Sequence, residues 1–322
     1  MRGNVLVLVS IPPQAAYYRT ALLEKDPELT VEAVSDTEAA QRAIGEADIF
    51  MSFGAGLKPD FFRGSSRLKW VHALGTGVDG IVDSKFLSRD VLVTATRGIH
   101  GIPMSEAAIM MMLALARDFR RTIRQQESQT WQRFYPQLLS GKTVGILGIG
   151  AIAEHLAPRC NAMGMRVVGI SRKVRTISGF DQIVERSDLN RIAAELDFLV
   201  LLIPYDAESH HIIDARILGA MKPTGFLVNL ARGGVVNEAS LINALAEKRI
   251  AGAALDAYAH EPLPSESPLW RMPNVICSPH MSGTWDGYAT ACFRQFACNY
   301  DHFVAGHPER MKHLEARGQL EA

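Results

Sequence analysis

The sequence lacks several features that mark membrane and nucleic-acid-binding proteins. Its longest apolar run, residues 108–116, ends at Arg117-Asp118, well short of the roughly 20 residues that cross a bilayer. The 34 basic residues are balanced by 34 acidic ones, so no summed positive field attracts a polyanion, and there is no polybasic tail. We therefore expect neither a membrane protein nor a nucleic-acid-binding protein, and small-molecule chemistry is favoured.

Cysteine is also scarce. The cysteines are scattered, with no CxxC pair and no histidine at zinc-ligand spacing, and they are Cys160, Cys277, Cys292 and Cys298. This pattern predicts no metal site and indicates buried thiols in a reducing compartment. The apolar run at 5–9 is short and lacks a signal-peptide cleavage site. We expect it to be a strand, and the protein to be cytoplasmic.

What the chain does have is an alternation of short apolar runs and helical patterns. The runs are VLVLV at 5–9, DIFMS at 48–52, WVHAL at 70–74, TVGIL at 143–147, RVVGI at 166–170, DFLVLLI at 197–203, GFLVNLA at 225–231, IAGAALDAY at 250–258 and NVICS at 274–278. Continuous apolar strands separated by helices predict parallel sheets covered on both faces. The fold class is α/β, doubly wound.

A chain of 322 residues, of which 48% are hydrophobic, exceeds the usual size of a single core, so two domains are expected. Pro103-Met104-Ser105-Glu106 and the apolar residues that follow predict a capped helix that starts at Ser105 and crosses between domains. A second helical pattern, from about 285 to 304, would return the chain to the first domain. We therefore expect one domain of residues 1–100 plus 286–322 and another of residues 101–285.

A glycine-rich segment follows the strand predicted at 143–147 and opens a helical stretch. In Gly148-Ile149-Gly150-Ala151-Ile152-Ala153, Gly148 permits a tight turn, Gly150 lets a pyrophosphate approach the backbone, and Ala153 replaces the third glycine. Such a pattern alone is weak, because glycines also serve as plain turn residues. Its place between strand and helix predicts that residues 101–285 form a Rossmann-type dinucleotide-binding domain, with Ala151 and Ile152 at the helix N-terminus beside the cofactor.

The next strand ends in a basic segment. An NAD enzyme places an acid about twenty residues after the glycines to hold the ribose hydroxyls, whereas this chain has Ser171-Arg172-Lys173 and no carboxylate available at that point. Two cations and a hydroxyl suit a 2′-phosphate. The alternative is a solvated basic loop, since Arg175 continues the charge run. We predict that NADP(H) is preferred over NAD(H).

Three further strands are followed by polar residues suited to catalysis. Arg232 follows the strand at 225–231, Glu261 follows the strand at 250–258, and His280 follows the strand at 274–278. Because the carboxyl ends of parallel strands meet at one sheet edge, we expect these side chains to emerge beside the Gly148 loop. Each alone has an ordinary structural explanation, as a surface cation, a turn residue or a strand-end histidine. His260 is a rival for the catalytic histidine.

Reduction of a 2-oxo acid needs a cationic clamp, a proton donor at the carbonyl oxygen and a reduced nicotinamide. Arg232 would be the clamp and His280 the donor, while Glu261 would hold the imidazole and raise its pKa. In the oxidative direction His280 would act as the base. The sequence therefore predicts hydride transfer between NADP(H) and a small 2-oxo or 2-hydroxy acid.

The segments NLARGGVVNEASLINAL, IAGAALDAYAHEPLP and PLWRMPNVICSPHMSG resemble the D-isomer-specific 2-hydroxyacid dehydrogenase family, and the resemblance covers almost the whole chain. It implies that Arg232, Glu261 and His280 are catalytic. It also implies that Asp256 bonds the nicotinamide carboxamide and that Pro204 and Leu230 line the cofactor.

The same resemblance assigns a substrate loop to the first domain, which would be a flavodoxin-like substrate domain. The loop contains Gly75, Thr76 and Gly77, and its amides would bind the substrate carboxylate, as a nest of N–H groups does. Its alternative is an ordinary glycine turn. Phe53-Gly54-Ala55 would form a neighbouring wall, and Arg232 and His280 would also contact substrate.

The basic segment at 171–173 resembles the NADP-using glyoxylate and hydroxypyruvate reductases of this family. The family's usual Pro-Leu-Thr is Pro204-Tyr205-Asp206 here, so this chain departs from the family at the threonine. Glyoxylate, hydroxypyruvate, pyruvate and arylpyruvates all remain open as substrates. Alternatives are a phosphoglycerate dehydrogenase-like enzyme and a nucleotide-sensing, corepressor-like binding protein on the same scaffold. The apolar stripe at 107–116 predicts a homodimer.

Overall fold

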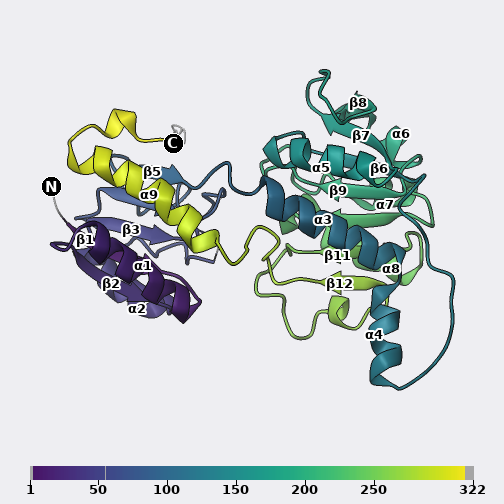
Figure 1. Ribbon diagram of the computed structural model, residues 1–322, viewed down its shortest axis with the longest axis horizontal. Coiled ribbons are helices and arrows are strands. Elements are labelled where there is room, and N and C mark those ends of the chain that lie inside the picture. Colours follow the sequence, from purple (N-terminus) through teal and green to yellow (C-terminus); the bar gives the residue numbers. More distant parts are fainter. Residues whose placement is uncertain (1–2, 55, 316–322) are drawn as a thin grey trace. The chain divides into compact units, whose positions relative to one another are not determined.

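The computed structural model describes residues 3–54 and 56–315. The chain divides into two compact units, Met1–Ile99 with Trp285–Ala322, and His100–Thr284 (Figure 1). Each unit is built on its own parallel sheet. The helices described in these residues include none that is both long and apolar enough to cross a membrane.

The first unit has a five-stranded sheet in the order β2-β1-β3-β4-β5, the arrangement of flavodoxin-like sheets. Its strands are β1 (Asn4–Leu8), β2 (Thr30–Val34), β3 (Ile49–Ser52), β4 (Trp70–Ala73) and β5 (Leu92–Ala95), and its helices are α1 (Pro12–Lys25), α2 (Thr37–Ala43) and α9 (Tyr288–Val304). Prolines 12 and 13 open α1, where their missing N–H groups cost no helical hydrogen bond.

Alternating residues of β1 supply two cores. Val5 and Val7 pack with Tyr18 of α1 and Phe296 of α9 on one face, whereas Leu6 and its neighbours pack on the other face. Because successive strand side chains point to opposite faces, an unbroken apolar strand needs cover on both.

The second unit has a seven-stranded parallel sheet in the order β12-β11-β10-β9-β6-β7-β8. Its strands are β6 (Thr143–Leu147), β7 (Arg166–Ser171), β8 (Gln182–Glu185), β9 (Phe198–Leu201), β10 (Phe226–Asn229), β11 (Gly252–Leu255) and β12 (Val275–Cys277). This is the Rossmann order with one added strand, and the direction of winding reverses between β6 and β9. The predicted doubly wound α/β fold class is confirmed.

Helices cover both faces of this sheet. α3 (Gly101–Ala116) and α5 (Ala151–Ala162) pack on one face. The other face is covered by α6 (Leu189–Ala193), α7 (Ala215–Ala220) and α8 (Glu238–Ala246). α4 (Phe119–Glu127) follows α3 and has no buried residue. Figure 1 shows α4 extending from the end of α3, away from the sheet.

Two details differ from the sequence-based expectations. The helix predicted to start with a cap at Ser105 begins at Gly101, and Ser105 is a buried interior residue whose hydroxyl donates to the Gly101 carbonyl. A serine can satisfy its hydroxyl in this way inside a helix, so the capping signature was misleading. All four cysteines are free, and Cys160 and Cys292 are buried, but Cys277 is half-buried and Cys298 is exposed, so the expectation of buried thiols is wrong for these two.

Candidate active site

The glycine loop lies between β6 and α5, at the point where the sheet reverses its winding. Gly148 has a positive φ of 101°, and a Cβ there would approach the Ile203 backbone nitrogen to 2.7 Å. Only glycine fits. A Cβ on Gly150 would instead meet open space, and no side chain of the described residues caps this end of α5.

The side of the glycine loop that is open suits a pyrophosphate. The first-turn amides of α5, in Ala151 and Ile152, lie at the positive end of the helix dipole. Ala153 is fully buried in the core under α5, where a small side chain is needed. The donor set and the space above Gly150 therefore fit a dinucleotide.

The basic segment after β7 is paired with carboxylates that lie far from it in the sequence. Arg172 donates through Nη2 to Asp206 Oδ2 at 2.7 Å, and the same nitrogen lies 2.8 Å from Glu208 Oε2. The expectation that no carboxylate is available there is wrong, because the turn after β9 brings two acids to the end of β7. The backbone amide of Lys173 donates a hydrogen bond to Ser171 Oγ at 3.4 Å.

Arg175 is not merely a solvated residue of the basic loop. Its Nη2 donates to the carbonyl of Ile149 at 2.9 Å, so it ties the basic segment to the glycine loop. Pro204, which follows β9, is exposed, and Leu230, which follows β10, is buried.

Arg232 follows β10 and precedes two glycines. A Cβ on Gly233 would lie 1.9 Å from the Tyr258 carbonyl oxygen, so glycine is needed where the β10 loop passes the end of β11. Arg232 Nη1 donates to the Ala231 carbonyl at 2.9 Å. Its positive charge acts to lower the pKa values of both Glu261 and His280. The three predicted residues therefore lie close enough to interact electrostatically.

Glu261 and His280 are directly hydrogen-bonded. His280 Nδ1 lies 2.7 Å from Glu261 Oε2, and both side chains are about one third exposed, at 35% and 32%. The other oxygen of Glu261 accepts from the Tyr258 amide at 3.0 Å. With Nδ1 protonated toward the carboxylate, Nε2 is left to exchange a proton with another molecule. The rival His260 lies exposed in the same loop.

The turn that carries His280 is held by Asp256. His280 has a φ of 51°, in the left-handed region, which is uncommon for a residue with a Cβ and costs conformational energy. Asp256 is buried at the end of β11. Its Oδ1 accepts from Ser278 Oγ at 2.6 Å and the Met281 amide at 2.9 Å, and its Oδ2 accepts from the Ser282 amide at 2.9 Å.

The pair shifts both pKa values in opposite directions. The hydrogen bond to Glu261 raises the pKa of His280 above its ordinary value, against the effects of partial burial and of Arg232. Partial burial alone would raise the pKa of Glu261, but the hydrogen bond and charge of His280 lower it overall, with help from the Tyr258 amide and Arg232. Both shifts favour an imidazolium beside a carboxylate over a neutral pair.

The predicted substrate loop lies at the carboxyl end of the first unit's sheet. Phe53 follows β3 and Gly75 follows β4, and these strands are neighbours. A Cβ on Gly75 would contact the Phe53 ring at 3.5 Å, and a Cβ on Gly54 would lie 2.3 Å from the Asp79 carbonyl oxygen. The sheet thus brings the two predicted segments together, while Ala55 lies outside the described residues.

Two contacts fix the substrate loop within the first unit. Thr76 Oγ1 donates to the Thr96 carbonyl at 3.2 Å. The hydroxyl of Tyr288, from α9, donates to the Leu74 carbonyl at 2.7 Å. Gly77 continues the same loop.

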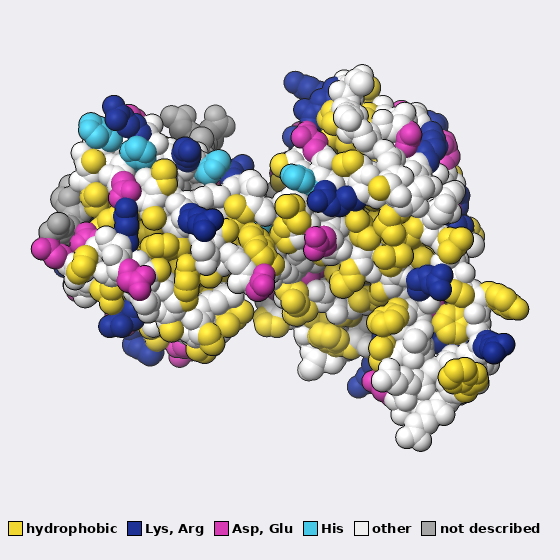
Figure 2. Space-filling view, in the orientation of Figure 1, with side chains coloured by type: hydrophobic (Ala, Val, Ile, Leu, Met, Phe, Trp, Pro, Cys, Tyr) yellow, Lys and Arg dark blue, Asp and Glu magenta, His cyan; other side chains and the backbone are white. Residues whose placement is uncertain are grey.

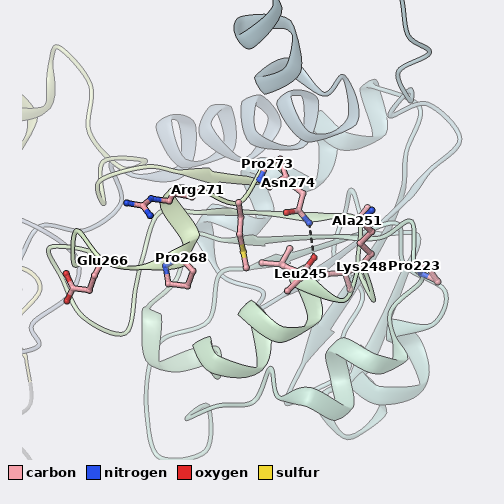
Figure 3. Close-up of a pocket in the computed structure, with 12 residues that line it drawn as sticks. Pro223, Leu245, Lys248, Ala251, Glu266, Pro268, Arg271, Pro273 and Asn274 are labelled. Carbon is pink, nitrogen blue, oxygen red and sulfur yellow. Dashed lines mark hydrogen bonds between the residues drawn. The ribbon is translucent and has the colours of Figure 1, made fainter.

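A hollow of about 740 Å³ lies elsewhere in the second unit. Figure 3 shows its lining, with Pro273 and Asn274 before β12, Ala251 before β11, and Leu245 of α8, whose carbonyl accepts from the Asn274 side chain. It is at the amino ends of the strands. Ligands of doubly wound sheets bind at the carboxyl ends, so the loops after β6, β7 and β9 to β12 form the candidate active site.

Comparison with known proteins identifies the family to which the chain belongs. The family model described as D-isomer specific 2-hydroxyacid dehydrogenase, NAD binding domain, matches residues 109–282. A glyoxylate reductase from Thermococcus gammatolerans is 32% identical over 269 residues, which cover 81% of this chain and 78% of that protein. A D-3-phosphoglycerate dehydrogenase from Methanocaldococcus jannaschii is 30% identical over 270 residues, 82% of this chain, but the match spans only 51% of that longer protein.

A solved structure is similar over nearly the full length. It is the NADPH-dependent glyoxylate/hydroxypyruvate reductase of Sinorhizobium meliloti, which is 28% identical, with a TM-score of 0.81 over 98% of this chain and 99% of that one. The family model alone spans more than half of the 322 residues. The chain therefore belongs to the D-isomer specific 2-hydroxyacid dehydrogenases, a family of NAD(P)-dependent oxidoreductases that act on CH–OH groups.

Proposed function

We propose that this chain is an NADP-dependent reductase of a small 2-oxo acid of the glyoxylate and hydroxypyruvate type. The observation that carries the proposal is the hydrogen-bonded pair of Glu261 and His280, at 2.7 Å, on a turn fixed by Asp256 at the sheet edge that carries the dinucleotide loop. Because the relatives include reductases and phosphoglycerate dehydrogenases, the substrate needs direct measurement.

In the proposed reaction, each of the polar residues that follow the strands has a separate chemical role. Bound NADPH would supply the hydride to the carbonyl carbon. Arg232 would clamp the carboxylate and carbonyl oxygen, and His280 Nε2 would protonate the developing alkoxide. Glu261 would keep Nδ1 protonated and the ring charged. Asp256 accepts three hydrogen bonds from the described residues, which leaves a lone pair of Oδ2 that suits a nicotinamide carboxamide.

The cofactor is proposed to lie along the carboxyl ends of β6, β7, β9 and β10. Gly148, Gly150 and the α5 amides would hold the pyrophosphate, and Pro204 and Leu230 would line the nicotinamide end. Ser171, Arg172 and Lys173 would bind the 2′-phosphate. The similar Sinorhizobium enzyme holds NADP in its structure, which supports this choice. In the first unit, the amides of residues 75–77 would bind a substrate carboxylate and Phe53 and Gly54 would form a pocket wall.

The test is a kinetic panel. NADPH and NADH oxidation would be followed with glyoxylate, hydroxypyruvate, pyruvate, phenylpyruvate and 3-phosphohydroxypyruvate. We expect the highest kcat/KM with NADPH and either glyoxylate or hydroxypyruvate. NADPH should be preferred over NADH by 10- to 10³-fold, or about 1.4–4 kcal/mol. Equal use of the two cofactors would contradict the NADP assignment, and activity on none of the acids would contradict the reductase itself.

We also propose that the chain is a homodimer. Ile102 and Met110 of α3 are exposed, as are Trp131, Tyr135 and Leu138 of the extended segment after α4. Figure 2 shows hydrophobic side chains gathered over this part of the second unit. Apolar patches on this scale are commonly covered in oligomers. Light scattering should give twice the chain mass, and a monomer mass at all concentrations would contradict the proposal.

The free cysteines support a reducing, cytoplasmic location.

A further inference from the structure

Arg186 lies beside the basic segment although it is far from it in the sequence. β7 and β8 are paired so that Ser171 is opposite Glu185. The next residues, Arg172 and Arg186, therefore leave the sheet from adjacent positions. Parallel pairing thus places a second guanidinium at the end of β7, where a dinucleotide's adenosine ribose lies in this fold.

The Arg186 guanidinium has buried donors that make no hydrogen bond to the described residues. Its side chain is 18% exposed. Among the residues that the structure describes, Nε and Nη1 find no hydrogen-bond partner. Buried donors of a charged group normally find acceptors, because leaving them unsatisfied costs free energy. The arrangement thus indicates an acceptor that is supplied from outside the chain.

The carboxylate of Glu208 lies close to both guanidinium groups. Its Oε2 lies 2.8 Å from Arg172 Nη2 and 3.8 Å from Arg186 Nη1. Its side chain is 71% exposed, so it can rotate into solvent at little cost. Asp206 differs, because its Oδ1 accepts from the Ser209 amide at 2.8 Å while its Oδ2 accepts from Arg172, and these bonds fix it in the turn.

We infer that Arg186 and Arg172 together form the 2′-phosphate site, and that Glu208 is a competing carboxylate that the phosphate must displace. This inference rests on the proposed use of NADP. A phosphate monoester offers three acceptor oxygens and nearly two negative charges, which two guanidinium groups recognise better than one. Glu208 neutralises part of that charge, so it lowers the affinity for a 2′-phosphate and leaves the affinity for its unphosphorylated counterpart nearly unchanged.

The experiment compares two probes that differ only in the 2′-phosphate. Adenosine 2′,5′-bisphosphate and 5′-AMP are titrated into the full chain by calorimetry at fixed ionic strength, with the variants Glu208→Gln and Arg186→Gln. Glu208→Gln should tighten bisphosphate binding by about 3- to 10-fold, and Arg186→Gln should weaken it by about 5- to 30-fold. Neither should change 5′-AMP binding by more than about 2-fold.

The matched control is Glu247→Gln. Glu247 is another exposed glutamate paired with an arginine, its Oε2 lying 2.6 Å from Arg249 Nε, and it should change neither affinity. Unchanged or weaker bisphosphate binding by Glu208→Gln would overturn the inference, as would an equal loss for both probes with Arg186→Gln. Because Glu208 is exposed, its variant remains informative even where Arg186→Gln folds poorly.

These titrations involve neither substrate nor Arg232 and His280. A chain inactive on every 2-oxo acid would refute the proposed reaction, yet the Glu208→Gln gain would still support the phosphate site. Conversely, an active NADPH-dependent enzyme whose Glu208→Gln variant binds the bisphosphate no better would retain the proposed function and lose only this inference.

Discussion

His72 lies inside β4 of the first unit and is fully buried, whereas His280 follows β12 of the second unit with 35% of its side chain exposed. The hydrogen-bond partners of His72 are hydroxyls. Its Nδ1 lies 2.8 Å from Thr94 Oγ1, and its Nε2 lies 3.2 Å from Thr96 Oγ1. The neighbour of His280 is the carboxylate of Glu261.

The two settings give the same ring opposite protonation behaviour. Burial, with a small contribution from His313, lowers the pKa of His72 to about 3, so that ring stays neutral across the physiological range. The bond to Glu261 raises the pKa of His280. Hydrogen-bond satisfaction alone therefore does not make a histidine reactive, because a chargeable ring also needs solvent access and an anionic partner.

The largest effect that separates the two histidines is expected for His280→Ala. It should lower kcat by about 10²–10⁴-fold, because it removes the proton donor, and Arg232→Ala should cost a similar factor through loss of transition-state binding. Steady-state kinetics would measure both. His260→Ala is the matched control and should keep near-normal activity. Near-normal turnover of His280→Ala would contradict the assignment of His280 as the proton donor.

His72→Ala should show the reverse pattern. We expect a loss of about 2–4 kcal/mol in the free energy of unfolding, because the change leaves a cavity and removes the ring's hydrogen bonds with Thr94 and Thr96. Urea denaturation followed by circular dichroism measures it. The kcat of the folded fraction should stay within about 3-fold of normal, as ordinary non-site substitutions allow. A larger loss of kcat would place His72 in the catalytic machinery.

Acid should destabilise the protein partly through His72. The unfolded chain takes up a proton at this ring near its ordinary pKa of 6.5, while the folded chain does so only near 3. Stability that is present above pH 6.5 is therefore lost as pH falls toward 3, by up to about 1.4 kcal/mol per pH unit. His72→Gln should flatten this slope in urea titrations between pH 6.5 and 4.5. An unchanged slope would show that His72 is not the source.

The smallest effect is expected for Glu261→Gln. The amide keeps a hydrogen-bond acceptor but loses the charge that raises the pKa of His280, so kcat should fall only about 10-fold. Reduction needs the protonated ring, so its rate declines as pH rises through that pKa. The decline should shift to lower pH in the variant. A pH profile of kcat with saturating substrate measures the shift, and an unmoved profile would argue against the pair.

The apolar runs of the sequence predict every interior strand and one edge strand, β12, but not the other three edge strands. These three are β2, β5 and β8, each at an outer edge of its sheet. An outer strand has fewer neighbours to bury it, so its pattern is mixed, as in QIVE of β8. The continuous apolar runs that were recognised belong mostly to strands covered on both sides.

The same limit explains which candidate site residues the sequence could group together. Arg232, Glu261 and His280 follow strands that stand out as apolar runs, so the topology could be anticipated and their grouping with it. Arg186 follows the unrecognised β8, and Glu208 lies in a turn more than thirty residues from Arg172. Their meeting depends on strand register and loop shape, which no local pattern encodes.

The division of the first unit between both ends of the chain has a consequence for biosynthesis. Phe296 of α9 stacks on Trp70 of β4 at 4.8 Å, and Tyr288 and Cys292 pack into the same core. During synthesis, this face of the sheet stays uncovered until α9 is made, which happens only after residues 100–284 have been translated. Because domains fold as units during synthesis, the contiguous second unit can reach its native packing first. Until α9 is made, the apolar face that it covers stays exposed, and such transiently exposed surface is prone to aggregation.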